Sequence, residues 1–165
     1  MIRQLYNSFG TTLYIQIWEK RLKIIDVKTG KTFDEQPLIA IERIDAKNSV
    51  VLGIGSKASS YSVTSKTKVT NPFSHPRVLC SDFVIAEKLL QDAITLVIDR
   101  KFVTPAPAVV IHPMERLEGG LTMVEVRVFR ELGLGAGARQ VVIHLGDEVS
   151  ISEFDFKKLS EDDGY

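Results

Sequence analysis

Two short apolar runs, AVVIHP (Ala108–Pro113) and QVVIHL (Gln140–Leu145), are nearly copies of each other. Continuous apolar runs of this length are typical of strands that are buried on both faces. Between them, roughly Thr122–Leu134 has the apolar spacing of a helix. The residues expected to face inward on that helix are Val124, Val128, Phe129 and Leu132. A strand, helix, strand order favours a parallel pair with a right-handed crossover, so the sequence predicts an α/β sheet.

The first third of the chain has the pattern of short antiparallel strands. Thr12–Ile17 and Arg21–Val27 are rich in β-branched and aromatic residues and are joined by the short stretch WEK. The stretch FDEQPLIAIER, in which Pro37 suggests a sheet edge or a strand start, and Ser49–Gly55 continue this meander. Together with the parallel pair, the meander predicts one mixed sheet with helices packed on it.

Between the meander and the parallel pair the pattern changes twice. Ser56–Arg77 is rich in Ser, Thr and Lys and closes with two prolines, which predicts a loop or an irregular excursion. From Asp82 onward the apolar residues follow a helical period, and Ser81 or Asp82 is expected to cap the helix. The apolar stripe of this helix comprises Val84, Ile85, Leu89, Leu90, Ala93, Ile94, Val97 and Ile98.

The composition argues against several classes of protein. Twenty-one basic and twenty-one acidic residues balance, so no net charge would attract nucleic acid or an anionic membrane. The lone cysteine, Cys80, excludes an internal disulfide and fits a reducing compartment. No apolar run reaches the roughly 18 residues of a membrane span, and the start MIRQLYNSFG lacks the apolar centre of a signal peptide. We therefore expect a cytoplasmic protein without direct membrane insertion.

Three glycines in five positions, Gly133, Gly135 and Gly137, raise the question of a phosphate-binding loop. Such a loop follows a strand and opens a helix, so that free backbone N–H groups face the anion. Here the glycines follow the predicted helix and precede a strand. We therefore expect them to end the helix, with Gly135 and Gly137 at positions that commonly need a left-handed backbone.

Three strings in the sequence carry a resemblance to a known family. They are PLIAI (Pro37–Ile41), NPFSHPRVLCSDFVIAEKLL (Asn71–Leu90) and AVVIHPMERLEGGLTMVEVRVFRELGLGAGARQVVI (Ala108–Ile143). In this order they resemble the first half of MreB, the bacterial actin-like rod-shape family, over about residues 13–143. The resemblance implies a single ribonuclease-H-like domain of the actin-like ATPase type. Family members have two such domains with ATP between them, and this chain ends where the crossover to the second would begin.

The resemblance places the family's first phosphate loop on the hairpin Tyr14–Leu22, where this chain departs from the family. Gln16 stands at the position of an Asp, Trp18 at that of a Gly, and Glu19 at that of a Thr or Ser. Gln16 lacks the carboxylate that would hold the water shell of Mg²⁺. Trp18 puts an indole where the backbone must approach the phosphates, and Glu19 sets a negative charge against them. We therefore expect no cofactor and no metal.

The resemblance also places Glu125 on the Glu that orients the attacking water in actin-like ATPases. The spacing Thr122-x-x-Glu125 equally matches a capping box, in which each side chain binds a backbone N–H at a helix start. A water-orienting residue without phosphate loops has nothing to act on, so we expect the cap. No catalytic residue and no ATPase activity are predicted.

The remaining polar residues show no strong catalytic or metal-binding pattern. His75, His112 and His144 share no metal-ligand spacing, although His112 and His144 each end a buried strand and could lie near each other. No acyl-enzyme signature surrounds Cys80, which we expect to be a buried or neutral thiol. Because Gln16 occupies the middle of the first strand, a two-metal nuclease site would lack its first ligand.

Residues 1–149 are predicted to form one domain, and residues 150–165 a C-terminal tail that packs on it. Ser152 could cap a short helix that presents Phe154, Phe156 and Leu159. In the actin-like architecture a helix returning from the second domain packs on the first. We expect the tail to substitute for that cover, since an exposed sheet face would be an apolar patch.

These features predict a non-catalytic protein-interaction module linked to bacterial cell shape or the cytoskeleton. Its expected partner is a protein, such as an MreB-type filament or a protein associated with one. One alternative is a divergent nucleotide-binding ATPase that completes its site by dimerisation. Another is a self-associating structural domain, hence a homo-oligomer, that uses an open sheet edge.

Overall fold

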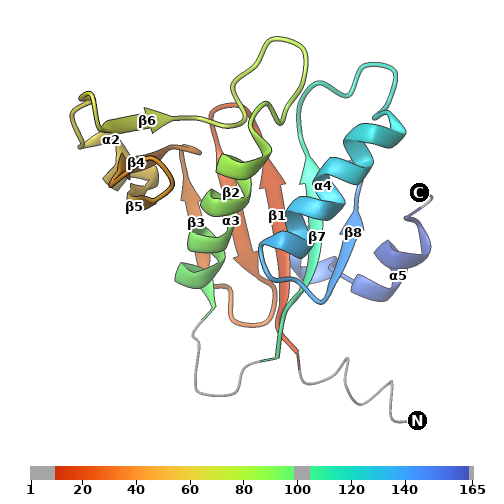
Figure 1. Ribbon diagram of the computed structural model, residues 1–165. Coiled ribbons are helices and arrows are strands. Elements are labelled where there is room, and N and C mark those ends of the chain that lie inside the picture. The colour runs from red at the N-terminus through yellow and green to blue at the C-terminus, as the bar shows by residue number, and fades with distance from the viewer. Residues whose placement is uncertain (1–9, 99–104, 164–165) are drawn as a thin grey trace.

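The computed structural model describes residues 10–98 and 105–163, which form two sheets. The larger sheet has five strands in the order β3-β2-β1-β7-β8, and the smaller has three in the order β5-β4-β6. In Figure 1, α3 and α4 lie in front of the larger sheet, and the smaller sheet stands at its left. The expectation about a signal peptide concerns mainly residues 1–9, which lie outside the described residues.

The larger sheet joins an antiparallel half to a parallel half. Its strands are β1 (Thr12–Ile17), β2 (Leu22–Asp26), β3 (Thr32–Glu35), β7 (Ala108–Pro113) and β8 (Gln140–Ile143). β2 is antiparallel to both β1 and β3, whereas β7 is parallel to both β1 and β8. The predicted hairpin and the predicted parallel pair are both confirmed. β1 is central, and all of its residues after Thr12 are buried.

The smaller sheet corrects the prediction of one mixed sheet. It contains β4 (Ile39–Arg43), β5 (Ser49–Ile54) and β6 (Thr67–Thr70), with the short helix α2 (Gly55–Ser59) after β5. Pro37 lies between β3 and β4 and has no backbone N–H, so the ladder of β3 cannot continue through it and β4 joins other strands.

The segment Ser56–Arg77 was expected to be irregular, and this expectation is wrong in part. It holds most of α2 and all of β6, which pairs antiparallel with β4. The β-branched residues Thr67, Val69 and Thr70 suit a strand, and pairing with β4 outweighs the polar composition around them.

Two helices pack on one face of the larger sheet, α3 (Phe83–Val97) and α4 (Met123–Gly135). The Asp82 carboxylate caps α3 by accepting the Ile85 N–H at 3.1 Å. The predicted apolar stripes are largely confirmed, but Val84 and Val124 are 62% and 72% exposed. Each lies two residues before the first buried residue of its helix, which is about 200° around the helix axis.

The glycines after α4 do end the helix, although not all in the expected way. Gly137 has φ +100°, in the left-handed region, and follows the last turn as predicted. Gly135 is instead the last residue of α4 and is not left-handed. A Cβ at Gly133 would lie 2.6 Å from Val141 Cγ2, so this glycine lets α4 approach β8 closely.

The tail packs on the opposite face of the larger sheet. It forms a 3₁₀ turn, η1 (Ile151–Glu153), and a short helix, α5 (Phe156–Glu161), beyond β8 in Figure 1. Its partly buried apolar residues Ile151, Phe154, Phe156 and Leu159, together with Val149 just before the tail, lie against Tyr14, Ile25, Val110 and Val142. Arg130 of α4 binds the Asp163 carboxylate with both distances at 3.1 Å.

The predicted cap of the tail helix is wrong. Asp155 caps α5 by accepting the N–H groups of Lys157 and Lys158. Ser152 lies inside η1, where its hydroxyl pairs with that of Ser150 at 2.7 Å. Within residues 10–98 and 105–163, no helix has the length and apolar character needed to cross a bilayer.

Candidate functional site

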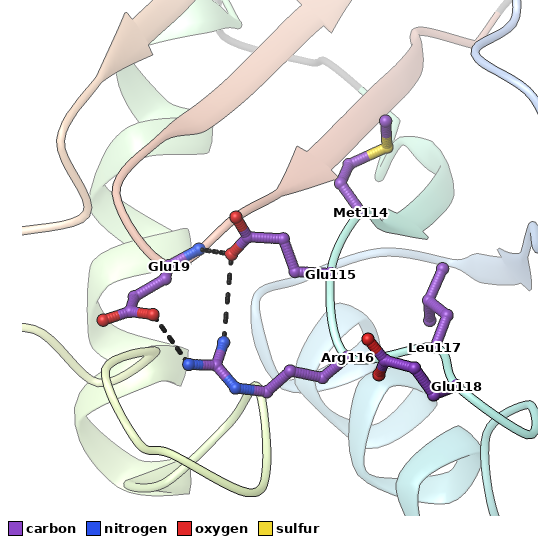
Figure 2. A pocket seen from close by; sticks show the side chains of 6 residues that line it. All are labelled: Glu19, Met114, Glu115, Arg116, Leu117 and Glu118. Carbon is purple, nitrogen blue, oxygen red and sulfur yellow. Dashed lines mark hydrogen bonds and ion pairs between the residues drawn. The ribbon is translucent and has the colours of Figure 1, made fainter.

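The candidate site lies where β1 and β7 end together at one edge of the larger sheet. Ile17 ends β1 in register with Pro113, which ends β7. The Ile17 carbonyl accepts the Met114 N–H at 2.9 Å, so the hairpin after β1 lies beside the loop after β7. Between them is an open hollow of about 750 Å³, shown in Figure 2 and lined by Glu19, Met114, Glu115, Arg116, Leu117 and Glu118.

Three polar groups of Glu19, at the hairpin tip, are bonded to neighbouring segments. Its backbone N–H donates to Glu115 Oε2 at 2.6 Å, and its carboxylate accepts from Arg116 Nη2 at 2.7 Å. Its carbonyl accepts from the side-chain amide of Asn71 at 2.7 Å. Figure 2 shows Arg116 reaching both carboxylates, with Nη1 at 3.8 Å from Glu115 Oε2. Side chains of neighbouring segments therefore hold the tip of the hairpin in place.

The hollow carries negative charge. Glu19, Glu115 and Glu118 line the hollow together with Arg116, which leaves a net charge of about −2 when all four side chains are ionised. The hydrogen bond from Arg116 holds the pKa of the Glu19 carboxyl below its usual range. A polyphosphate approaching this edge would meet a lining of its own sign.

Arg116 has an unusual backbone. Its φ is +58°, and it is the one non-glycine residue in the left-handed region among residues 10–98 and 105–163. This conformation costs a residue with a Cβ about 1–2 kcal/mol. A left-handed backbone persists at such a residue where the surroundings hold it in place. Here the carboxylates of Glu19 and Glu115 hold Arg116 by binding its guanidinium.

Gln16 and Trp18 are engaged elsewhere. Gln16 is fully buried, its Nε2 lies 3.9 Å from Met114 Sδ, and its Oε1 has no hydrogen-bond partner in the described part of the chain. The Trp18 ring lies under the guanidinium of Arg21, at 5.1 Å. The position that the resemblance assigns to the metal-binding Asp thus holds the buried amide of Gln16. The backbone N–H of Glu19 is bound to the Glu115 carboxylate. These residues do not fit Mg²⁺ and a nucleotide phosphate.

Glu125 and Thr122 form a capping box at the start of α4. Thr122 Oγ1 accepts the Glu125 N–H at 3.3 Å, and Glu125 Oε2 accepts the Thr122 N–H at 2.8 Å. The Glu125 carboxylate is thereby occupied by the backbone of its own helix.

His112 and His144 do lie together, with ring centroids 4.6 Å apart. His112 Nε2 lies 3.1 Å from the Gly146 carbonyl, which can only accept, so this nitrogen carries the proton. Its Nδ1 therefore accepts the Tyr14 hydroxyl proton at 2.7 Å, and the Tyr14 oxygen accepts the Val149 N–H at 3.2 Å. Burial lowers the pKa of His112 to about 4 and raises the pKa of Tyr14. The network ties the strands to the segment that leads into the tail.

The other two candidate residues, His75 and Cys80, take no part in the hollow or in the His112 network. The His75 ring accepts the Arg77 N–H at 3.2 Å, within its own loop. Burial raises the pKa of the Cys80 thiol to about 11, as expected for an inert thiol. No group of three or more His, Cys, Asp or Glu side chains in the described ranges could hold a metal ion.

Sequence reasoning missed Glu115 and Arg116. Both lie in the loop that follows the buried run AVVIHP. The signal was available, because the carboxyl ends of parallel strands meet at one edge of a sheet, which brings this loop to the hairpin.

Among known proteins, the chain is similar to bacterial MreB. It is 26% identical over 145 residues to cell shape-determining protein MreB of Haemophilus influenzae, and 27% over 146 residues to that of Escherichia coli K12. These alignments cover 87% of this chain, which spans 40% of each relative's length. It is also 38% identical over 80 residues to the uncharacterized protein YjaA of Escherichia coli K12, covering 44% of this chain and 63% of YjaA. No family model matches the chain.

Solved structures support the expected fold class. MreB5 of Spiroplasma citri bound to ADP superposes with a TM-score of 0.62 at 15% identity, over 82% of this chain and 38% of that protein. A non-polymerising mutant of MamK bound to AMPPNP gives a TM-score of 0.57 at 12% identity, over 81% of this chain and 40% of that protein. Likenesses at these identities show the fold, and the prediction of a single actin-like domain is confirmed. The chain is thus similar to part of MreB over 87% of its own residues, and it has the α/β fold of an actin-like domain.

Proposed function

We propose that this protein is a non-catalytic, MreB-related interaction module with a role in bacterial cell shape or the cytoskeleton. One observation carries the non-catalytic part: the Glu19 N–H donates to Glu115 Oε2 at 2.6 Å. The resemblance assigns this hairpin to phosphate, and here the chain's own carboxylate holds its amide beside two further acidic residues. The similarity to cell shape-determining MreB supports the cytoskeletal part.

We propose the start of α4 as the contact with the partner. Met123 and Val124 lie next to each other in the first turn, and each is 72% exposed. Two adjacent apolar side chains at this exposure would gain about 1–2 kcal/mol each on burial in an interface. The proposed partner is an MreB-type filament or a protein bound to one. The unpaired Cys80 suits the reducing cytoplasm, where we place this role.

Co-sedimentation with MreB filaments tests the proposal. The wild-type protein should pellet with filaments of Escherichia coli MreB in a saturable way, and stay in the supernatant without them. The double variant Met123→Ser with Val124→Ser should pellet less. Val63→Ser is the matched control, because Val63 is 70% exposed in another part of the fold. A wild-type protein that never pellets with filaments contradicts the proposal.

Self-association is a second candidate function. β5 is an edge strand of the smaller sheet, and Val50 on it is 44% exposed. An open apolar edge can pair with the edge of a second copy. Sedimentation velocity over a hundredfold range of concentration distinguishes the two candidates. A dimer that Val50→Lys converts to monomer would support self-association, and a monomer throughout would exclude it.

A further inference from the structure

We propose that the β1–β2 hairpin carries a built-in substitute for an anionic ligand. The Glu115 carboxylate occupies the backbone amide of Glu19, and the Arg116 guanidinium supplies the positive charge beside it. This inference rests on the proposed function, because it explains how a hairpin that has lost its ligand keeps its shape.

The turn geometry leaves the Glu19 amide in need of an acceptor. The hairpin is closed by one backbone bond, from Trp18 N–H to the Arg21 carbonyl at 2.9 Å. The Glu19 N–H lies inside this turn and donates out of it to Glu115 Oε2. Backbone amides that point out of a tight turn are anion-binding groups, and an amide that donates to a carboxylate forms a charge-assisted hydrogen bond.

The guanidinium completes the arrangement. Arg116 lies 2.7 Å from Glu19 Oε2 and 3.8 Å from Glu115 Oε2, with a side chain that is only 19% exposed. One backbone amide and one guanidinium around one carboxylate are the groups that bind a small oxyanion elsewhere. The left-handed backbone of Arg116 places the guanidinium there. The anion at this edge is therefore supplied from within the chain.

Removal of the internal carboxylates should expose a phosphate site. In the double variant Glu19→Ser with Glu115→Ala, the residue 19 amide and the Arg116 guanidinium lose their partners. The hollow then keeps Glu118 and Arg116, so its net charge changes from about −2 to about zero. A free anion such as inorganic phosphate can then occupy the position of the lost carboxylate.

A matched control variant separates the effect of the Glu115 contact from the effect of the net charge of the hollow. Glu118 lines the same hollow, but Figure 2 draws no hydrogen bond or ion pair between its carboxylate and Glu19 or Arg116. The double variant Glu19→Ser with Glu118→Ala therefore has the same net charge, while Glu115 still holds the amide. The probe is inorganic phosphate, titrated at constant ionic strength against chloride, with thermal unfolding and calorimetry as readouts.

We expect phosphate to bind the Glu115→Ala double variant at least about tenfold more tightly than the Glu118→Ala double variant or the wild type. Equal binding by both double variants would overturn the inference, because net charge alone would then control the site, and no binding by either would overturn it as well. A wild type that binds phosphate or nucleotide would instead contradict the proposed function. These results distinguish the failure of one proposal from the failure of the other.

A measurement in single variants covers the case in which the double variants do not fold. The amide resonance of Glu19 should move strongly in Glu115→Gln, because a neutral amide oxygen replaces the carboxylate. It should move little in Glu118→Gln. Equal shifts in both variants, or no shift in either, would contradict the assignment of Glu115 as the internal anion.

Discussion

Acidification should destabilise this protein through one buried histidine. His112 is fully buried, and its two ring nitrogens are engaged by the Tyr14 hydroxyl and the Gly146 carbonyl. A proton on Nδ1 would face the Tyr14 oxygen, which already accepts the Val149 N–H. Burial and the neighbouring His144 lower the pKa of His112 from 6.5 to about 4. The folded protein therefore disfavours the charged ring.

The magnitude follows from the difference between the two pKa values. As the pH falls below about 6.5, the unfolded chain binds a proton at His112 that the folded protein does not bind. Stability is therefore lost as the pH falls, and the loss ends near pH 4, where the folded protein also binds the proton. A pKa difference of about 2.5 at about 1.4 kcal/mol per unit gives a full loss of about 3.5 kcal/mol, of which about 3 kcal/mol is lost by pH 4.

Urea unfolding between pH 7 and pH 4, followed by the fluorescence of the single tryptophan, measures this loss. His112→Gln is the comparison, because its side chain stays neutral while the titration of the carboxylates is common to both proteins. The wild type should lose about 3 kcal/mol more than His112→Gln over this range. Parallel pH profiles for the two proteins would refute the reasoning.

Three further predictions concern the helix cap, the tail and the cysteine. Thr122→Ala should lower the free energy of unfolding by about 1 kcal/mol in urea, because Thr122 caps α4, and an unchanged value would contradict the capping role. Deletion of residues 150–165 should lower the melting temperature and the solubility, since it uncovers the sheet face around Tyr14 and Val110; unchanged values would mean that the tail is not a cover. Cys80 should react with a thiol reagent at pH 7 far more slowly than free cysteine, as its thiol pKa of about 11 requires, and a rapid reaction would contradict this burial.

The parts of the fold that depend on local pattern could be predicted from the sequence. The runs AVVIHP and QVVIHL share the apolar stretch VVI, and they contain the adjacent parallel strands β7 and β8. Gly137 lies after the last turn of α4 with the left-handed backbone that helix ends commonly need. Asp82 caps α3, as its position before an apolar helical period indicates.

Features that depend on tertiary context could not be predicted in the same way. Val84 and Val124 are apolar, but their angular positions on the helices turn them away from the sheet, and only the packing sets which face is inward. β6 forms because β4 offers it a partner. The division into two sheets depends on where β4 finds its neighbours after Pro37.

Of the residues that form the candidate site, Glu19 was predicted from the sequence, whereas Glu115 and Arg116 were not. Glu19 was recognised because the resemblance marks its position, and its charge is adverse to phosphate. The resemblance marks neither Glu115 nor Arg116. Their role depends on the hydrogen bonds that form when β1 and β7 lie side by side. A loop residue that holds a neighbouring hairpin has no periodic signal in the sequence.

Calorimetric titration of the wild-type protein with ATP and with ADP, each with Mg²⁺, tests the central claim most directly. The protein concentration should be high enough for a millimolar dissociation constant to be seen. Because the Glu19 amide is bound to Glu115 and the hollow is acidic, the account predicts no heat of binding and no shift in melting temperature. Clear 1:1 binding of either nucleotide would contradict it, and Glu125 would then be the first residue to substitute.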